Sequence, residues 1–156
     1  FLHLHLMSQL KEKLYLQCLD YVQKRMEAAE LGIKEAQQAS KDDTKSSAGD
    51  KYETGRAMMQ QETDRNLAQL NEANKLKVAL TLVSATALSK QVENGSVVIT
   101  DNGKFYIAIS AGTLVVDDEQ YFAISPASPI GLKMKGLKAG DEFNLNGKGY
   151  RIETVL

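Results

Sequence analysis

The sequence predicts an α+β protein in which two long helices precede a small β domain. Residues 9–39 contain no proline and a single glycine, and their apolar side chains recur at alternating steps of four and three, as on one face of a helix. A second run with helical spacing begins near Ser47 or Asp50 and extends to about Lys90. After residue 92, short apolar runs alternate with tight turns that contain glycine, a pattern typical of β-hairpins.

The two helical runs have similar lengths, and a short polar stretch at residues 40–50 joins them. Matched helices with a tight connection fold back on each other. We therefore expect residues 7–92 to form an antiparallel coiled-coil hairpin with its tip at residues 40–50. The faces expected to meet carry Tyr15, Leu19, Val22, Met26, Ala29, Ile33 and Ala36 on the first helix, and Leu67, Leu70, Ala73, Leu76, Leu80 and Val83 on the second.

Residues 93–156 are expected to form a small antiparallel β domain. Asn102-Gly103 and Asn146-Gly147 each separate two apolar runs, which is a strong signal for a hairpin. A loop that contains Pro126 and Pro129 precedes a short helix. The expected strands are residues 97–99, 104–109, 113–116, 120–124, 142–145 and 150–155, and the expected helix is residues 130–135.

Composition narrows the classes of function. The net charge is −1, which argues against autonomous sequence-specific binding to DNA through phosphate contacts. Residues 1–6 are apolar but too short to span a membrane, and we interpret them as a leader or a start artefact. The chain has one cysteine, Cys18, which favours a reducing, cytoplasmic location and is expected in the core. Thiol catalysis is not expected, because His3 and His5 are the only histidines.

The polar stretch between the helices holds the candidate functional residues Asp42, Asp43 and Asp50. Carboxylate oxygens are suitable ligands for Mg²⁺, and the end of a helical hairpin would present them far from its base. The alternative interpretation is a solvated loop, in which Ser47 or Asp50 caps the second helix and Glu53 completes a capping box. The residue types alone favour this alternative.

Two segments resemble the bacterial Gre transcript-cleavage and elongation factors. The first is Asp43-Thr44-Lys45-Ser46-Ser47-Ala48 followed by Tyr52-Glu53, which is similar to the tip pattern of that family. The second is Ser128-Pro129-Ile130-Gly131, then Gly136, then Ala139-Gly140-Asp141-Glu142, which is similar to its carboxy-terminal signature. The resemblance covers nearly the whole chain from about Leu10, and the second segment is its more specific part.

The resemblance implies an accessory protein that is not itself an enzyme. The β domain would have an FKBP-like fold and would dock on RNA polymerase through Ser128, Pro129 and Ile130. The hairpin would enter the secondary channel, where Lys45 and Ser46 would contact the polymerase and the tip would lie near the nascent RNA. Asp43, helped by Asp42 or Asp50, would hold a Mg²⁺ shared with the polymerase active site and assist cleavage of backtracked RNA. No membrane and no cofactor of its own are implied.

The tip departs from the family pattern at Ser46, where the family has a second acidic residue, and Gly49-Asp50 are two additional residues. A regulator that occupies the channel without promoting cleavage is therefore an alternative. A coiled-coil adaptor protein is a third, from a different functional class. The terminal signature favours the two polymerase-binding hypotheses over the adaptor.

Overall fold

The computed structural model describes residues 2–45 and 49–156; the side chains of residues 40, 42–45 and 49–52 lie outside the described set. The described chain divides into two compact units. Unit 1 contains Phe1–Tyr21 and Val78–Leu156, and unit 2 contains Val22–Lys77. The order of elements, two long helices followed by strands around a short helix, confirms the predicted α+β class.

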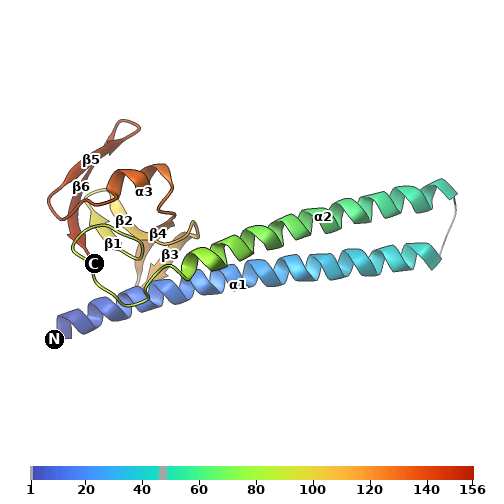
Figure 1. Cartoon of the computed structure of the whole chain (residues 1–156), viewed down its shortest axis with the longest axis horizontal. Helices are drawn as coiled ribbons and strands as arrows, with labels where there is room; N and C mark the ends of the chain where they lie inside the picture. Colours follow the sequence, from blue (N-terminus) through green and yellow to red (C-terminus); the bar gives the residue numbers. More distant parts are fainter. Residues whose placement is uncertain (1, 46–48) are drawn as a thin grey trace. The chain divides into compact units, whose positions relative to one another are not determined.

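The long helices are α1 (Leu2–Lys45) and α2 (Gly49–Leu80), drawn in Figure 1. The first helix therefore includes residues 2–8 and 40–45, which the prediction left outside it, because no proline interrupts either stretch. The second helix stops ten residues before Lys90. At the carboxy-terminal end of α2, the backbone hydrogen bonds span three residues instead of four, from Thr81 N to Val78 O and from Val83 N to Leu80 O. The Thr81 hydroxyl also donates to Val78 O.

In unit 2 the two helices lie side by side and run in opposite directions. Arg25 Nη2 donates to Gln69 Oε1 at 3.1 Å, and Gly32 lies against Asn66, so the residue number rises on one helix as it falls on the other. Val22, Ala29 and Ala36, seven residues apart, are buried on α1, and Ala73 is buried on α2. Small side chains at these positions allow the helices to approach closely.

The predicted faces are partly wrong. Leu19 and Leu67 were expected in the contact, but 38% and 44% of their surfaces are exposed. The neighbouring Cys18 is fully buried, as expected, and Asn66 takes the contact position in place of Leu67. The periodicity identified the helix faces to within one residue, but it could not recognise a polar side chain in the contact.

Unit 1 holds a sheet of six strands within the described residues, in the order β3-β4-β2-β1-β6-β5 (Figure 1). The strands and the short helix are β1 (Val97–Thr100), β2 (Gly103–Ile107), β3 (Gly112–Val116), β4 (Glu119–Ile124), α3 (Pro129–Met134), β5 (Glu142–Leu145) and β6 (Lys148–Val155). Each expected strand and the short helix is present, and β5 has the predicted bounds.

The sheet is mixed and not antiparallel as predicted. The β1–β2, β3–β4 and β5–β6 pairs are antiparallel, but β2 pairs with β4 in parallel, with Phe105 opposite Phe122. The residues between β2 and β4 include β3, which forms a hairpin with β4 through Asp117 and Asp118 at positive φ. Turn residues fix such local hairpins, whereas a pairing between non-consecutive strands depends on packing.

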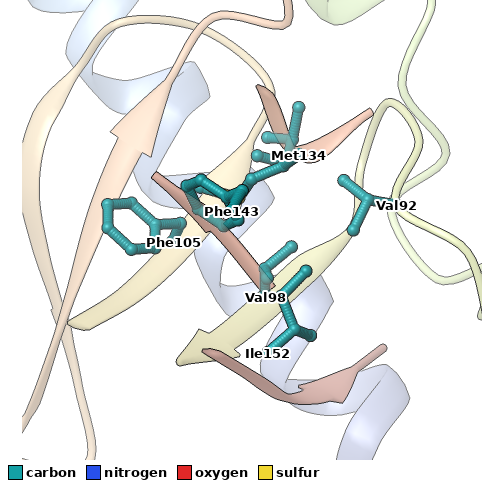
Figure 2. Close-up of a cluster of buried hydrophobic side chains, with 7 residues drawn as sticks. Val92, Val98, Phe105, Met134, Phe143 and Ile152 are labelled. Atoms are coloured by element: carbon teal, nitrogen blue, oxygen red, sulfur yellow. The ribbon is translucent and has the colours of Figure 1, made fainter. Parts of the chain in front are cut away.

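One face of the sheet packs against α3 in an apolar core (Figure 2). Alternation along β2 places Phe105 and Ile107 on this face and Tyr106 on the other. The seven residues of the core are Val92, Val98, Phe105, Ile107, Met134, Phe143 and Ile152. Near the other face lies the part of α1 that belongs to unit 1, where Leu14 and Cys18 are fully buried, as predicted for Cys18. Gln17 of α1 reaches this part of the sheet, with its Nε2 2.7 Å from Val115 O.

Candidate functional site

The backbone brings the predicted tip residues to the ends of two helices. Asp42, Asp43 and Lys45 lie in the last turn of α1, and Asp50 lies in the first turn of α2. Because the helices are antiparallel in unit 2, these turns are at the same end of the helix pair. Ser46 lies outside the described residues, as do the side chains of the other four, so the proposed Mg²⁺ ligation by Asp43 stays a prediction.

Ser128, Pro129 and Ile130 build the start of α3. The Ser128 hydroxyl accepts a hydrogen bond from Gly131 N at 3.1 Å and donates to Ser125 O at 2.6 Å, so it caps the helix and holds the preceding loop. Pro129 occupies the first turn, where its missing N–H has no cost, and is exposed. Ile130 is half-buried against the apolar core. This motif therefore has a structural role, and of its three residues Pro129 is the exposed one.

Two glycines of the same signature are required by the backbone. A Cβ on Gly131 would lie 2.9 Å from Pro126 O and 3.0 Å from the Ser128 hydroxyl, so a larger residue would displace the loop. Gly136 follows α3 with φ +79°, and its N–H donates to Val92 O at 3.0 Å. Further along, the Asp141 carboxylate accepts from Lys138 N at 2.9 Å. The signature residues thus fix α3 against the segment that precedes β1.

An open groove of about 750 Å³ lies beside α3 in unit 1. Pro126, Ala127 and Gly131 of the motif loop contribute to one wall, and residues 91–94 contribute to another. Leu82 and Leu132 line it with 72% and 62% of their surfaces exposed. Two exposed apolar side chains therefore border this groove. We call this feature the α3 groove; its lining comprises Leu82, Ser84, Gln91, Val92, Glu93, Asn94, Ile107, Pro126, Ala127, Gly131, Leu132, Lys135 and Gly136.

Most residues that line the α3 groove were not among the predicted site residues. Ser128, Pro129 and Ile130 are next to it but do not line it. Leu132 lies within the predicted helix, and its exposure depends on which face of that helix meets the core. Leu82 lies beyond α2 in a segment that was expected to continue the helix. The local sequence pattern around Leu82 and Leu132 did not indicate that either residue lines a groove.

Burial shifts the pKa of Cys18 and of Lys11, both of which lie on α1 in unit 1. Burial raises the pKa of the Cys18 thiol to about 12, so this side chain stays protonated at neutral pH. Lys11 is 2% exposed and its ammonium donates to Ala87 O and to Leu156 O, the latter at 3.3 Å. Desolvation lowers the pKa of Lys11, and the nearby charge of Glu93 offsets part of this effect.

Within the described residues, no three His, Cys, Asp or Glu side chains gather in a way that could hold a metal ion. None of the helices in that part of the chain is both long and apolar enough to cross a membrane. Comparisons with models of protein families, with curated proteins and with solved structures find no match to the chain.

Proposed function

We propose that the protein is a Gre-type elongation factor that binds RNA polymerase and acts through the acidic end of its helical unit. The observation that carries the proposal is that Asp42, Asp43 and Asp50 reach one end of the helix pair although they belong to two helices. The proposal includes the finer description of the fold, an antiparallel coiled-coil hairpin with an FKBP-like β domain, and a cytoplasmic location.

The positions of the first two aspartates support a functional role. A negative charge in the last turn of a helix is destabilising by about 0.3–1 kcal/mol, because the helix dipole is negative at that end. Asp42 and Asp43 lie in this turn of α1, whereas Asp50 lies in the first turn of α2, where the dipole favours it. The stability of α1 therefore does not explain why aspartates occupy positions 42 and 43. Delivery of carboxylates to a cation would explain them.

Asp43 would be the main ligand, with Asp42 or Asp50 as the second carboxylate. A Mg²⁺ shared with the polymerase would stabilise the attacking and leaving oxygens during cleavage of the backtracked nascent RNA. The residues of this chain would supply oxygen ligands and hold them on a rigid support. Lys45 and Ser46, next to the ligands in the sequence, would contact the polymerase.

The α3 groove is the docking surface that we assign to the polymerase. Its exposed leucines offer apolar area, and Glu93 and Lys135 line it with opposite charges. A partner segment with an apolar face and charged flanks fits such a surface. The structural motif at Ser128–Ile130 would act by holding α3 in place and by presenting Pro129 beside the groove.

Ser46 favours a second candidate function. The tip lacks a carboxylate at this position, and Mg²⁺ gives up its water ligands reluctantly, so a single carboxylate binds it weakly. A protein with the same architecture would then occupy the channel and regulate the polymerase without promoting cleavage.

A cleavage assay on a stalled, backtracked elongation complex with the cognate polymerase tests the proposal. We expect the full chain to bind the complex and to accelerate the shortening of the RNA in a Mg²⁺-dependent manner. Binding without acceleration at any Mg²⁺ concentration would favour the regulator. Absence of binding to the polymerase would contradict both functions and favour the coiled-coil adaptor, which self-association in solution would support.

A further inference from the structure

The two faces of the sheet are packed differently. The face that meets α3 has a core made only of apolar side chains. On the opposite face, Tyr106 projects from the centre of β2 with no exposed surface. It lies between two buried neighbours in the sheet, since Val97 of β1 and Ala123 of β4 are its partners in the register.

The hydroxyl of Tyr106 has no hydrogen-bond partner among the described residues. Cys18 and Tyr15 of α1 are close enough to it to add to the increase in its pKa, which burial dominates. Neither satisfies it: Tyr15 donates to Leu80 O at 3.4 Å, and the Cys18 thiol is a weak donor and acceptor. A buried hydroxyl without a partner destabilises the packing around it.

Besides the buried Leu14 and Cys18, residues 2–21 of α1 make several polar contacts around this centre. Ser8 and Lys11 bond to the carbonyls of Thr86 and Ala87, and Gln17 bonds to Val115 O. Lys13 pairs with Asp117 at 3.6 Å, with both side chains more than half exposed. Exposed pairs of this kind contribute about 1 kcal/mol or less.

From this arrangement we infer that residues 2–21 of α1 separate reversibly from the sheet while the sheet stays folded, and that the unpaired Tyr106 hydroxyl sets how often they do so. The apolar core on the α3 side contains residues of β1, β2, β5 and β6 and none of α1. Separation of α1 would expose the buried residues on the face of the sheet opposite α3, among them Val97, Leu114 and Val116. It would also remove the contacts of α1 within unit 1, so that the position of this helix becomes adjustable. The inference does not depend on the proposed function.

Cys18 reports this motion directly, because it is the only cysteine of the chain and is fully buried. In the full chain under native conditions, we measure how often Cys18 becomes accessible to a thiol reagent. We expect this opening frequency to be at least about tenfold higher than the frequency at which the sheet opens. The reference is amide exchange at Ile107 in β2, whose N–H donates to Ser96 O at 2.9 Å. Equal opening frequencies for Cys18 and Ile107 would overturn the inference, whether or not any variant folds.

Tyr106→Phe removes the unpaired hydroxyl and keeps the ring. We expect this variant to modify Cys18 about tenfold more slowly than the parent, because the closed state no longer buries an unsatisfied group. Tyr121→Phe is the matched control, since Tyr121 is also buried on the sheet but its hydroxyl is not among the buried groups without a partner. An unchanged or faster rate in Tyr106→Phe, or the same slowing in Tyr121→Phe, would contradict the role of Tyr106.

Discussion

Asn66 of α2 packs directly against Gly32 of α1, and the absence of a side chain on Gly32 makes the contact possible. A Cβ built on Gly32 would lie 2.6 Å from Asn66 Cγ. The amide of Asn66 is held in place, since its Nδ2 donates to Glu62 O at 2.9 Å. The glycine therefore leaves room for the Asn66 amide at this level, although glycine weakens a helix by about 1 kcal/mol relative to alanine.

Gly32→Ala is expected to leave the stability of the protein unchanged or to lower it by up to about 1 kcal/mol, because the added methyl group displaces the Asn66 amide from its hydrogen bond with Glu62 O and this loss offsets the gain in helix propensity. Chemical denaturation followed by circular dichroism measures the effect. At an exposed position in a helix the same substitution would stabilise, so a stabilised Gly32→Ala variant would show that the contact is absent in solution.

The double variant Gly32→Ala, Asn66→Ala is the control for this prediction. Removing the amide restores the space, so we expect the double variant to be more stable than Gly32→Ala alone. A coupling free energy of about 1 kcal/mol or more between the two positions would indicate direct contact. Additive effects would mean that the cost of Gly32→Ala arises elsewhere in the helix.

The same contact shows where sequence reasoning stopped. The heptad pattern identified both helices and placed Val22, Ala29 and Ala36 correctly on the buried face. It put Leu67 in the contact because leucine is apolar, whereas the structure puts Asn66 there. The fit of Asn66 to Gly32 is a complementarity between residues on two helices, and the period of one helix cannot reveal it.

The β domain was predictable to the extent that its turns are local. Asn146-Gly147 predicted the β5–β6 hairpin, and both residues have the positive φ that such a turn requires. The parallel β2–β4 pairing has no turn of its own and was missed. For the candidate sites, the motif at Ser128 was recognised from sequence, but the α3 groove needs Leu82 and Leu132 to come together through the fold.

Leu132→Ser should weaken binding to RNA polymerase at least about tenfold if the α3 groove is the docking surface. Leu132 is 62% exposed, so its replacement should change the stability of the protein by less than about 0.5 kcal/mol. The matched control is Leu16→Ser, because Leu16 is 53% exposed and does not line the groove. Pull-down with purified polymerase distinguishes the two; equal binding by both variants would exclude the groove as the docking surface.

Cys18 should make the stability of the protein depend on pH in the alkaline range. Burial raises the pKa of its thiol from 9.0 to about 12, so above pH 9.0 the unfolded chain loses a proton that the folded chain keeps. The folded state then binds more protons, and its stability falls as the pH rises from 9.0 toward about 12. The lowered pKa of Lys11 has the opposite effect, since it makes stability rise with pH up to 10.5.

Comparison of the parent with Cys18→Ala isolates this effect, because both chains contain Lys11. At neutral pH we expect the variant to be less stable by about 1–2 kcal/mol, since a buried side chain is shortened. The free energies of unfolding should converge as the pH rises above 9.0 and should cross before about pH 12, because the parent alone loses stability over this interval. A difference that stays constant across this interval would mean that the thiol is accessible to solvent in the folded state.

Asp43→Asn should remove most of any stimulated RNA cleavage while leaving polymerase binding unchanged. The amide keeps the size of the side chain but loses the charge that would hold Mg²⁺. Asp20→Asn serves as a control, because Asp20 is an exposed aspartate of the same helix outside the tip. Cleavage at the parental rate by Asp43→Asn would refute the role of Asp43 as a ligand.

Ser46→Glu introduces an acidic residue at the position where the family pattern has one and this chain has serine. A second carboxylate near Asp43 would let the tip chelate Mg²⁺ through two oxygen ligands, so we expect the cleavage rate to rise and half-saturation to need less Mg²⁺. The control is Ser46→Gln, which has a similar size without the charge. If the parent does not stimulate cleavage and Ser46→Glu does, the parent is the channel-occupying regulator and its missing carboxylate is the reason. If neither chain stimulates cleavage although both bind the polymerase, the two additional residues Gly49-Asp50 have changed the tip geometry so that one carboxylate does not restore the site.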